Sequence, residues 1–381
     1  MILAIKVRLE PNDKQNSKLF QASGTARFIY NWTLARQEEN YALKGTHKNS
    51  GKFISDNDLR KEITQLKKTE QYRWLNTVSN NIAKQAVKDG CEAYKKFFKR
   101  LAEKPRFKSR RKSKPSFYHD TDKIKFTETH VQLEKLGKVK LSECNRIPTN
   151  VKYSNPRVTH DGIHWYISVG VEVEDELYEL TGESIGIDLG IKDLAICSNR
   201  EEPYKNINKG KKVKKLEKKL RRLQRKVSRK YEKNKEGRSY VKTSNIVKLE
   251  KNIRKLHRNL DNIRTDYRHK ITTEIVKTKP SRIVMESLNV KGMMRNKHLS
   301  KAVAQQGFHE FKTMVQYKAE RYGIEFVEAD TWYPSSKTCS KCGYVKPKLS
   351  LSERLFVCEC CGSEIDRDAN ASINLSRYKV S

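Results

Sequence analysis

Four cysteines near the C-terminus have the residue type and spacing of a metal site. Cys339 and Cys342 form one C-x-x-C pair, and Cys358 and Cys361 form a second pair after fifteen intervening residues. Two such pairs are typical of a tetrahedral zinc site, in which four thiolates leave no open position for chemistry. We therefore predict a structural Zn²⁺ ion held by these four residues. Cys360 lacks the ligand spacing, and we interpret it as a spare thiol.

Three separated acidic positions could supply the chemistry. Asp188 lies in the strand-like segment 184–190, and Glu286 ends a second apolar segment. The third position is Asp366 or Asp368, where the last helical pattern begins. Each acid alone is more simply explained as a turn residue, a strand end or a helix cap. Together, in a chain with a zinc ribbon, they indicate oxygen ligands for two Mg²⁺ ions that hydrolyse a phosphodiester.

The elements that must position these residues indicate an α/β chain. Alternating apolar residues predict strands at residues 1–10 and within 122–174, which we expect to form a small antiparallel sheet or barrel. Residues 12–104 have a helical pattern. In residues 209–270, apolar residues recur at intervals of three and four on both sides of Gly237, which predicts an antiparallel helical hairpin with an apolar seam.

The composition identifies the class of partner. The 381 residues include 81 Lys and Arg against 45 Asp and Glu, which gives a net charge of +36. Self-repulsion on this scale is destabilising unless a polyanion neutralises it, so nucleic acid is the expected partner. A membrane surface is the competing interpretation, but the basic residues run through the whole chain, and no apolar run approaches the roughly 20 residues of a membrane span. Five of the eight cysteines cluster around one site, which suits a reducing compartment and the cytoplasm.

Two basic segments are candidate contacts for the nucleic-acid backbone. The segment 105–114 has little core potential, and we favour phosphate contact over a solvated loop. The first half of the helical hairpin is too one-sidedly basic for a face that only confers solubility. The residues that we predict to contact nucleic acid are Arg106, Lys108, Arg110, Arg111, Lys112, Lys211, Lys215 and Arg222.

These motifs, taken in order, resemble the TnpB proteins of bacterial and archaeal insertion sequences and the related miniature type V CRISPR effectors. The resemblance covers nearly the whole chain. Its main segments are Gly186–Ile191, Met285–Val290, Ser335–Gly343 and Asp366–Ala371, with Lys6–Pro11, Ala26–Asn31 and Pro105–Arg110 in the N-terminal half. Cys360 is a departure from the family pattern, but it leaves the required cysteine pair intact.

The resemblance implies a RuvC-like nuclease of RNase H fold with an inserted zinc ribbon. Its catalytic and magnesium-binding triad would be Asp188, Glu286 and Asp368, because the family places the last acid two residues before the Asn of Asn-Ala. The chain would also contain an N-terminal β-barrel, called the wedge, with an inserted helical recognition domain. The implied boundaries are 1–10 and 118–180 for the wedge, 11–117 for the recognition domain, 181–334 with 364–381 for the nuclease domain, and 335–363 for the ribbon.

The activity that the resemblance implies is RNA-guided cleavage of double-stranded DNA. The guide RNA would come from the transposon end, and the protein would read only a short target-adjacent motif. We expect a monomer with one RNA, associated with the nucleoid. Other hypotheses are a CRISPR effector, a non-cleaving RNA-guided DNA binder, a conventional transposase and a zinc-ribbon RNA-binding protein. The intact triad disfavours the non-cleaving binder, and the ribbon directly before the last acid disfavours the conventional transposase.

Overall fold

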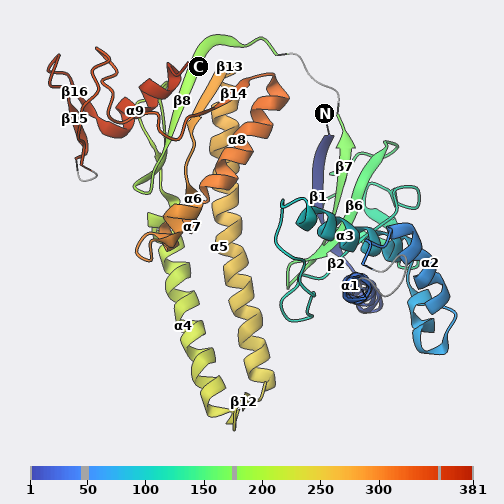
Figure 1. Cartoon of the computed structure of the whole chain (residues 1–381). Coiled ribbons are helices and arrows are strands. Elements are labelled where there is room, and N and C mark those ends of the chain that lie inside the picture. The colour runs from blue at the N-terminus through green and yellow to red at the C-terminus, as the bar shows by residue number, and fades with distance from the viewer. Residues whose placement is uncertain (1, 44–50, 174–177, 351–352, 380–381) are drawn as a thin grey trace. The chain divides into compact units, whose positions relative to one another are not determined.

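The computed structural model describes residues 2–43, 51–173, 178–350 and 353–379. The chain divides into two compact units, Met1–Glu174 and Asp175–Ser381 (Figure 1). Within the described residues, no helix is long and apolar enough to span a membrane.

The first unit contains a seven-stranded antiparallel sheet. Its strand order is β2-β6-β7-β1-β5-β4-β3. The strands are β1 (Ile2–Glu10), β2 (Ser116–Tyr118), β3 (Lys125–Phe126), β4 (His130–Leu133), β5 (Gly137–Leu141), β6 (Tyr153–His160) and β7 (Trp165–Glu172). The first strand joins this sheet, as the sequence predicts, and it pairs with β7 from Ile2 to Leu9 and with β5 at Leu9 and Glu10. After the inserted helices, the chain re-enters the sheet at Ser116, two residues before the wedge boundary that the resemblance implies.

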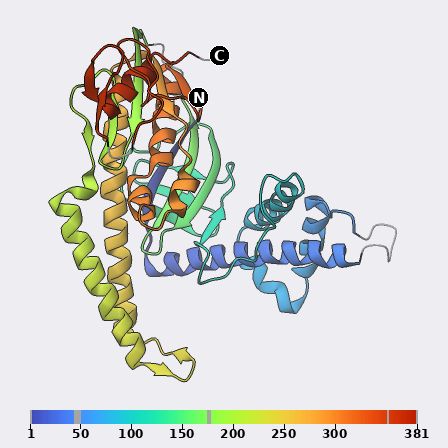
Figure 2. The same cartoon turned by 60° about the vertical axis from the view of Figure 1, so that its left-hand side comes forward.

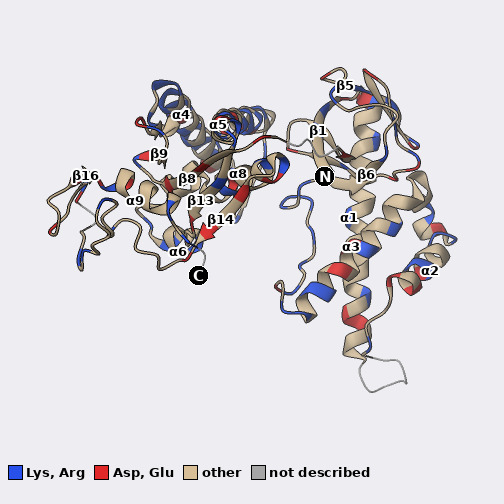
Figure 3. Cartoon of the chain, turned by 90° about the horizontal axis from the view of Figure 1, so that it is seen from above, with Lys and Arg blue, Asp and Glu red and all other residues tan. Residues whose placement is uncertain are grey.

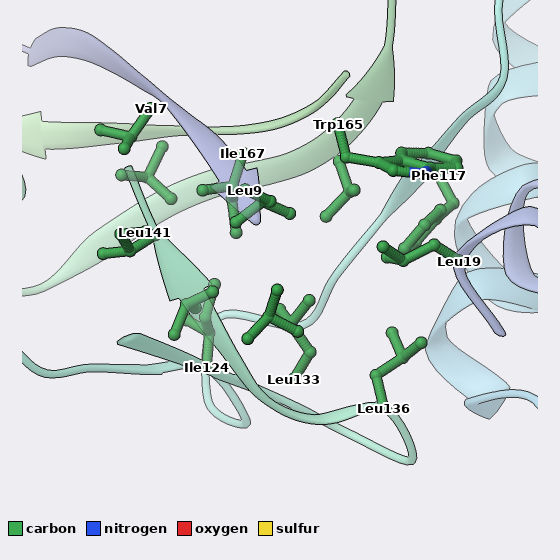
Figure 4. Packing of buried hydrophobic residues seen from close by; sticks show 14 of the residues in the cluster. Val7, Leu9, Leu19, Phe117, Ile124, Leu133, Leu136, Leu141, Trp165 and Ile167 are labelled. Atoms are coloured by element: carbon green, nitrogen blue, oxygen red, sulfur yellow. The ribbon is translucent and has the colours of Figure 1, made fainter. Parts of the chain in front are cut away.

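The core of this sheet follows the period-two pattern of its strands. Trp165, Ile167, Val169 and Val171 alternate along β7 and are all buried, because successive side chains of a strand point to opposite faces. Figure 4 shows the packing of this core, in which Leu19 of a neighbouring helix lies beside Phe117 and Trp165. The core thus joins the sheet to the helices inserted after its first strand.

Some of those helices pack against the sheet, and the others pack on the helices themselves. They are α1 (Asp13–Ala42), α2 (Asp56–Leu66), the 3₁₀ helix η1 (Glu70–Thr77) and α3 (Asn80–Phe98). The Asn12 side chain accepts the Gln15 backbone amide, and the Gln15 side chain accepts the Asn12 amide, so that a capping box begins α1. A Cβ on Gly90 would lie 2.7 Å from the Thr33 side chain, so glycine permits the close approach of α3 to α1.

The second unit is built on a mixed five-stranded sheet of order β10-β9-β8-β13-β14. The strands are β8 (Thr181–Leu189), β9 (Asp193–Cys197), β10 (Tyr204–Lys205), β13 (Pro280–Glu286) and β14 (Glu325–Ala329). Strands β8, β13 and β14 are parallel, whereas β9 and β10 are antiparallel to their neighbours. The carboxyl ends of the three parallel strands therefore lie at one edge of the sheet.

Helices of the second unit cover this sheet and extend from it. Two long helices, α4 (Lys211–Lys233) and α5 (Ser244–Lys277), run side by side and are joined through the short hairpin of β11 (Lys235–Glu236) and β12 (Ser239–Tyr240) (Figures 1 and 2). The remaining elements are η2 (Ile207–Lys209), α6 (Val290–Arg295), α7 (Ser300–Gln306), α8 (Phe308–Tyr322) and α9 (Arg367–Ser376). The hairpin β15 (Leu355–Val357) and β16 (Glu364–Asp366) precedes α9.

Candidate active site and metal centre

The register of the parallel strands brings two of the predicted acids together. Met285 of β13 is paired with Ile187 of β8, so Glu286 and Asp188 follow at neighbouring positions. Ile185 and Ile187 are buried in the core, while Asp188 is 9% exposed. Both acids thus lie at the carboxyl edge of the sheet, where open α/β sheets commonly bind ligands.

Gly186 allows the last helix to reach these acids. A Cβ at this position would lie 1.9 Å from the Ser372 backbone oxygen and 2.4 Å from the Ser376 backbone nitrogen. Real side chains do not tolerate such distances, so β8 and α9 can pack this closely only across a glycine. The element that approaches Gly186 is therefore α9.

The two candidates for the third acid have different roles. The Asp366 side chain caps α9 by accepting the backbone amides of Asp368 and Ala369, at 3.0 and 3.1 Å. Asp368 lies inside the first turn of the helix, and its carboxylate interacts electrostatically with Asp188. The cap interpretation therefore applies to Asp366, whose charge raises the pKa of Asp188 less than the charge of Asp368 does.

The site concentrates negative charge. Burial raises the pKa of Asp188 well above its usual range, and the charges of Glu286 and Asp368 raise it further. Two guanidinium groups lie close to Asp368: Arg367 Nη2 is 3.1 Å and Arg354 Nη1 is 3.6 Å from its carboxylate oxygens. The charges of Glu286 and Asp368 thus act on Asp188, and carboxylate oxygens are the hard ligands that suit a divalent cation such as Mg²⁺.

The segment before the first cysteine pair, which the resemblance includes without a role of its own, contacts one of the acids and the helix that carries another. The Ser335 hydroxyl donates to Glu286 Oε1. On α9, the buried Asn370 donates to the Thr338 carbonyl at 2.7 Å and accepts the Ser340 amide at 2.9 Å. The buried Asn374 donates to the carbonyls of Ser335 and Thr338. The segment 335–340 therefore links the strand of Glu286 to the helix of Asp368.

The four predicted cysteines form one cluster. Their sulfur atoms all lie within 4.8 Å of one another. Cys339 Sγ is 3.7 Å from Cys361 Sγ, and Cys342 Sγ is 3.5 Å from Cys358 Sγ. A tetrahedron with Zn–S bonds of about 2.3 Å has edges of about 3.8 Å, so the donor set fits a Zn²⁺ ion. The cluster could hold such an ion without any change of fold.

Each cysteine pair forms a matching turn. The amide of Gly343 donates to the Cys339 carbonyl, and the amide of Gly362 donates to the Cys358 carbonyl. Both glycines have positive φ, at +79° and +66°, a conformation that other residues rarely adopt. Cys360 is exposed and lies outside the cluster, in agreement with its interpretation as a spare thiol.

The predicted nucleic-acid contacts have unlike surroundings. Lys211, Lys215 and Arg222 are exposed on α4, whose surface is almost entirely basic (Figure 3). In the part of the chain that the structure describes, no Lys or Arg of α4 forms an ion pair. The acidic Glu217 of α4 is instead neutralised by Arg264 of α5, at 2.9 Å.

The basic linker contains one residue that differs from the rest. The ammonium group of Lys108 lies 3.6 Å from the centre of the Tyr30 ring, and burial lowers the pKa of Lys108. Its backbone exchanges two hydrogen bonds with the Asn31 side chain. These contacts anchor the linker to α1, whereas Arg106, Arg110, Arg111 and Lys112 are exposed.

Family models match three parts of the chain. A model described as "Helix-turn-helix domain" (HTH_OrfB_IS605) matches residues 1–46, "Probable transposase" (OrfB_IS605) matches 168–297, and "Cas12f1-like, TNB domain" matches 308–375. The described part of the first match, however, is one strand followed by one long helix.

Curated relatives match nearly the whole chain. A protein of Streptomyces pristinaespiralis, named as a candidate RNA-guided DNA endonuclease, is 29% identical over 98% of this chain and 88% of its own length. InsQ of Escherichia coli K12, named in the same way, is 29% identical over 98% of this chain and 91% of its own length. The chain is thus similar to the OrfB proteins of IS605-type insertion sequences and to proteins that are named as RNA-guided DNA endonucleases.

A solved structure shares the fold. The Cas12f1 chain in a complex with single-guide RNA and target DNA, determined by electron cryo-microscopy, superposes with a TM-score of 0.63. The alignment covers 99% of this chain and 98% of that chain, at 15% identity. At this level of identity the likeness supports a common fold.

Proposed function

We propose that this protein is an RNA-guided DNA endonuclease encoded by a transposon, which cuts double-stranded DNA at one RuvC-type site. The observation that carries the proposal is that Asp188 and Glu286 occupy neighbouring strand ends of β8 and β13, and that the charges of Glu286 and of Asp368 on α9 both act on Asp188. The names of the relatives from Streptomyces pristinaespiralis and Escherichia coli support guidance by RNA and DNA as the substrate. The mixed sheet, with α9 packed on β8, is compatible with an RNase H fold.

The three acids would hold Mg²⁺. When bound, two such ions activate water and stabilise the leaving oxygen of the phosphodiester. Asp188 is buried, so its carboxylate offers a fixed and poorly hydrated oxygen, while Glu286 is oriented by the hydroxyl of Ser335. The chain's own residues thus fix the geometry at the reacting phosphate and limit the access of bulk water.

The four cysteines would hold Zn²⁺ with a structural role. Four thiolates saturate a tetrahedral ion, so no position remains for water or substrate. The segment 335–340 leads into the first cysteine pair and also contacts both Glu286 and α9. The ion would therefore stabilise the segment that holds the active site together.

The basic surfaces would hold RNA and DNA. The exposed face of α4 carries Lys and Arg side chains without an ion pair to any described residue, in a unit that also contains the acids. The sheet of the first unit and the helices inserted in it would form the wedge (1–10 and 118–180) and the recognition domain (11–117), which would hold the guide–target duplex and read the target-adjacent motif. We propose a monomer with one guide RNA, acting at the nucleoid.

The proposal is tested by sequencing the RNA that co-purifies with the full chain. We expect one discrete transcript that ends in a variable guide segment. The purified complex should then cut a plasmid that carries the matching target beside a library of short flanking motifs. A heterogeneous set of cellular RNAs, with cutting that ignores the target sequence, would reduce the protein to an unguided nuclease. The DNA that encodes the guide distinguishes the two roles: a transposon end would indicate the transposon role, and a repeat array would indicate a CRISPR effector.

A further inference from the structure

Trp332 exposes almost all of its side chain. Its exposed fraction is 91%, the largest recorded for a large apolar side chain in the described residues. Single exposed apolar residues are common on proteins, but Trp has the most to gain from burial and usually finds a partner. The exposure therefore directs attention to the local structure that presents this side chain.

The turn that carries Trp332 is fixed on both sides. The Tyr333 amide donates to the Asp330 carbonyl at 3.0 Å, which closes a β-turn with Thr331 and Trp332 at its centre. The Tyr378 hydroxyl donates to the Asp330 carboxylate at 2.8 Å, and the Tyr333 ring packs edge-on against the Tyr378 ring at 4.8 Å. The indole is thus held outward by a packed turn.

This turn lies at the catalytic edge of the sheet. Ala329, the last residue of β14, is paired with Glu286 in the parallel register, and the turn follows immediately. Three residues after Trp332, Ser335 donates to Glu286. Three residues span at most about 11 Å, which corresponds to roughly three stacked nucleotides of one DNA strand. A strand that is bound at the three acids and runs toward this turn would reach the indole within a few nucleotides.

We propose that Trp332 stacks on an unpaired base of the DNA strand being cut, within a few nucleotides of the scissile phosphate. This inference rests on the proposed function. Stacking on an aromatic side chain tolerates any base, which suits an enzyme whose sequence is read by a guide. Arg377 and Lys379, both exposed on either side of Tyr378, supply positive charge for the phosphates next to that base.

The direct test places 2-aminopurine, a fluorescent adenine analogue, at successive positions of the cut strand. The probe is bound by the guide complex of Asp188→Ala, which retains the indole and cannot cut. We expect the fluorescence to be quenched at one or two adjacent positions. Adding Trp332→Leu should remove this quenching, whereas adding Trp332→Phe should leave it in place. Val345→Ala, which removes another exposed apolar side chain, should leave the fluorescence unchanged. Fluorescence that is independent of residue 332 at every position would overturn the inference.

A kinetic test uses the cutting enzyme. Trp332→Leu should slow guided cleavage about tenfold, within the range measured for loss of one base–aromatic stack. Removal of the base at the stacked position should slow the wild-type chain by a similar factor and leave Trp332→Leu unaffected. Equal effects of base removal in both chains would overturn the stacking. Failure of the wild-type complex to cut a matched target would instead overturn the proposed function as well, so the two failures are distinguishable.

Discussion

At the scale of single residues, the active site depends on side chains that never meet the substrate. Glu286 ends a strand, where a carboxylate on a flexible side chain could adopt many rotamers. The hydroxyl of Ser335, itself 3% exposed, donates to this carboxylate and selects one of them. Hydrogen-bonding partners of this kind orient metal ligands, and their loss typically costs tenfold or more in affinity or activity.

Ser335→Ala should therefore lower guided cleavage about tenfold and raise the Mg²⁺ concentration needed for half-maximal rate. Binding of the guide and the target should not change, because Ser335 is buried and belongs neither to α4 nor to the basic linker. The measurement is cleavage rate against Mg²⁺ concentration. Ser336→Ala is the matched control, since its neighbouring hydroxyl makes no recorded hydrogen bond within the described residues. Equal rates for the two variants would show that Ser335 does not orient Glu286.

Residue types explain which site residues the sequence can predict. Asp188 and Glu286 interrupt apolar strands, and the cysteines have a diagnostic spacing, so these residues stand out in one dimension. Asn370 and Asn374 make their key hydrogen bonds to backbone groups of residues 335–340. Every residue has backbone groups, so a hydrogen bond to them cannot be predicted from residue types, and the role of these two side chains is seen only in the structure. The role of Trp332 is also not predictable from the sequence, because the residue type alone does not tell whether its side chain is exposed.

At the scale of elements, the contact between β8 and α9 determines whether Asp368 reaches the other acids. Gly186→Ala should destabilise the chain by about 3 kcal/mol, the upper range for overpacked sites, because its Cβ would meet the α9 backbone at 1.9 Å. Thermal unfolding and guided cleavage both report the change. The control is Gly182→Ala in the same strand, where a Cβ would meet nothing within 4 Å. A Gly186→Ala chain as stable and active as this control would contradict the packing.

The zinc ribbon is the second element whose integrity the site requires. Cys339→Ser should abolish stoichiometric zinc and lower the stability of the second unit, because metal binding is coupled to folding. Zinc content by atomic absorption and the unfolding temperature are the measurements. Cys360→Ser removes the exposed thiol beside the cluster and should keep both values at the wild-type level. Full zinc occupancy in Cys339→Ser would remove this residue from the ligand set.

Element boundaries were less predictable than the elements themselves. The sequence predicts a strand from residue 184, but β8 begins at Thr181, because the exposed Thr181–Glu183 carry no apolar signal. The helical hairpin is predicted to end near residue 270, yet α5 continues to Lys277. In its last turns, Ile271, Ile275 and Val276 are buried against the sheet. The apolar residues of α5 therefore pack on α4 in one part of the helix and on the sheet in the other.

At the scale of the whole molecule, a net charge of +36 makes nucleic-acid binding dependent on salt. Replacing Lys211, Lys215 and Arg222 by Gln should reduce the slope of log Kd against log salt by up to about 2.7, because each lost phosphate contact removes about 0.9. The control replaces Lys61, Lys95 and Lys270, which are each paired with an acid on their own helix. Equal slopes for the two triple variants would exclude α4 as the binding surface.

Composition predicts the class of partner at this scale, but it cannot predict which strands pair. The position of β1 between β5 and β7, and that of β8 between β9 and β13, depend on contacts between residues far apart in the chain. The family motifs occur in both units, so the resemblance predicts a fold class that periodicity alone does not predict.

The central claim is that base pairing with a guide RNA directs the acids of the second unit to one DNA site. Its most direct test measures cleavage of a plasmid by the reconstituted complex with Mg²⁺, using a target that matches the guide and a target that does not. We predict cutting of the matched target alone, and loss of that cutting with retained target binding in Asp188→Ala. Cutting of both targets, or cutting by Asp188→Ala, would contradict the account.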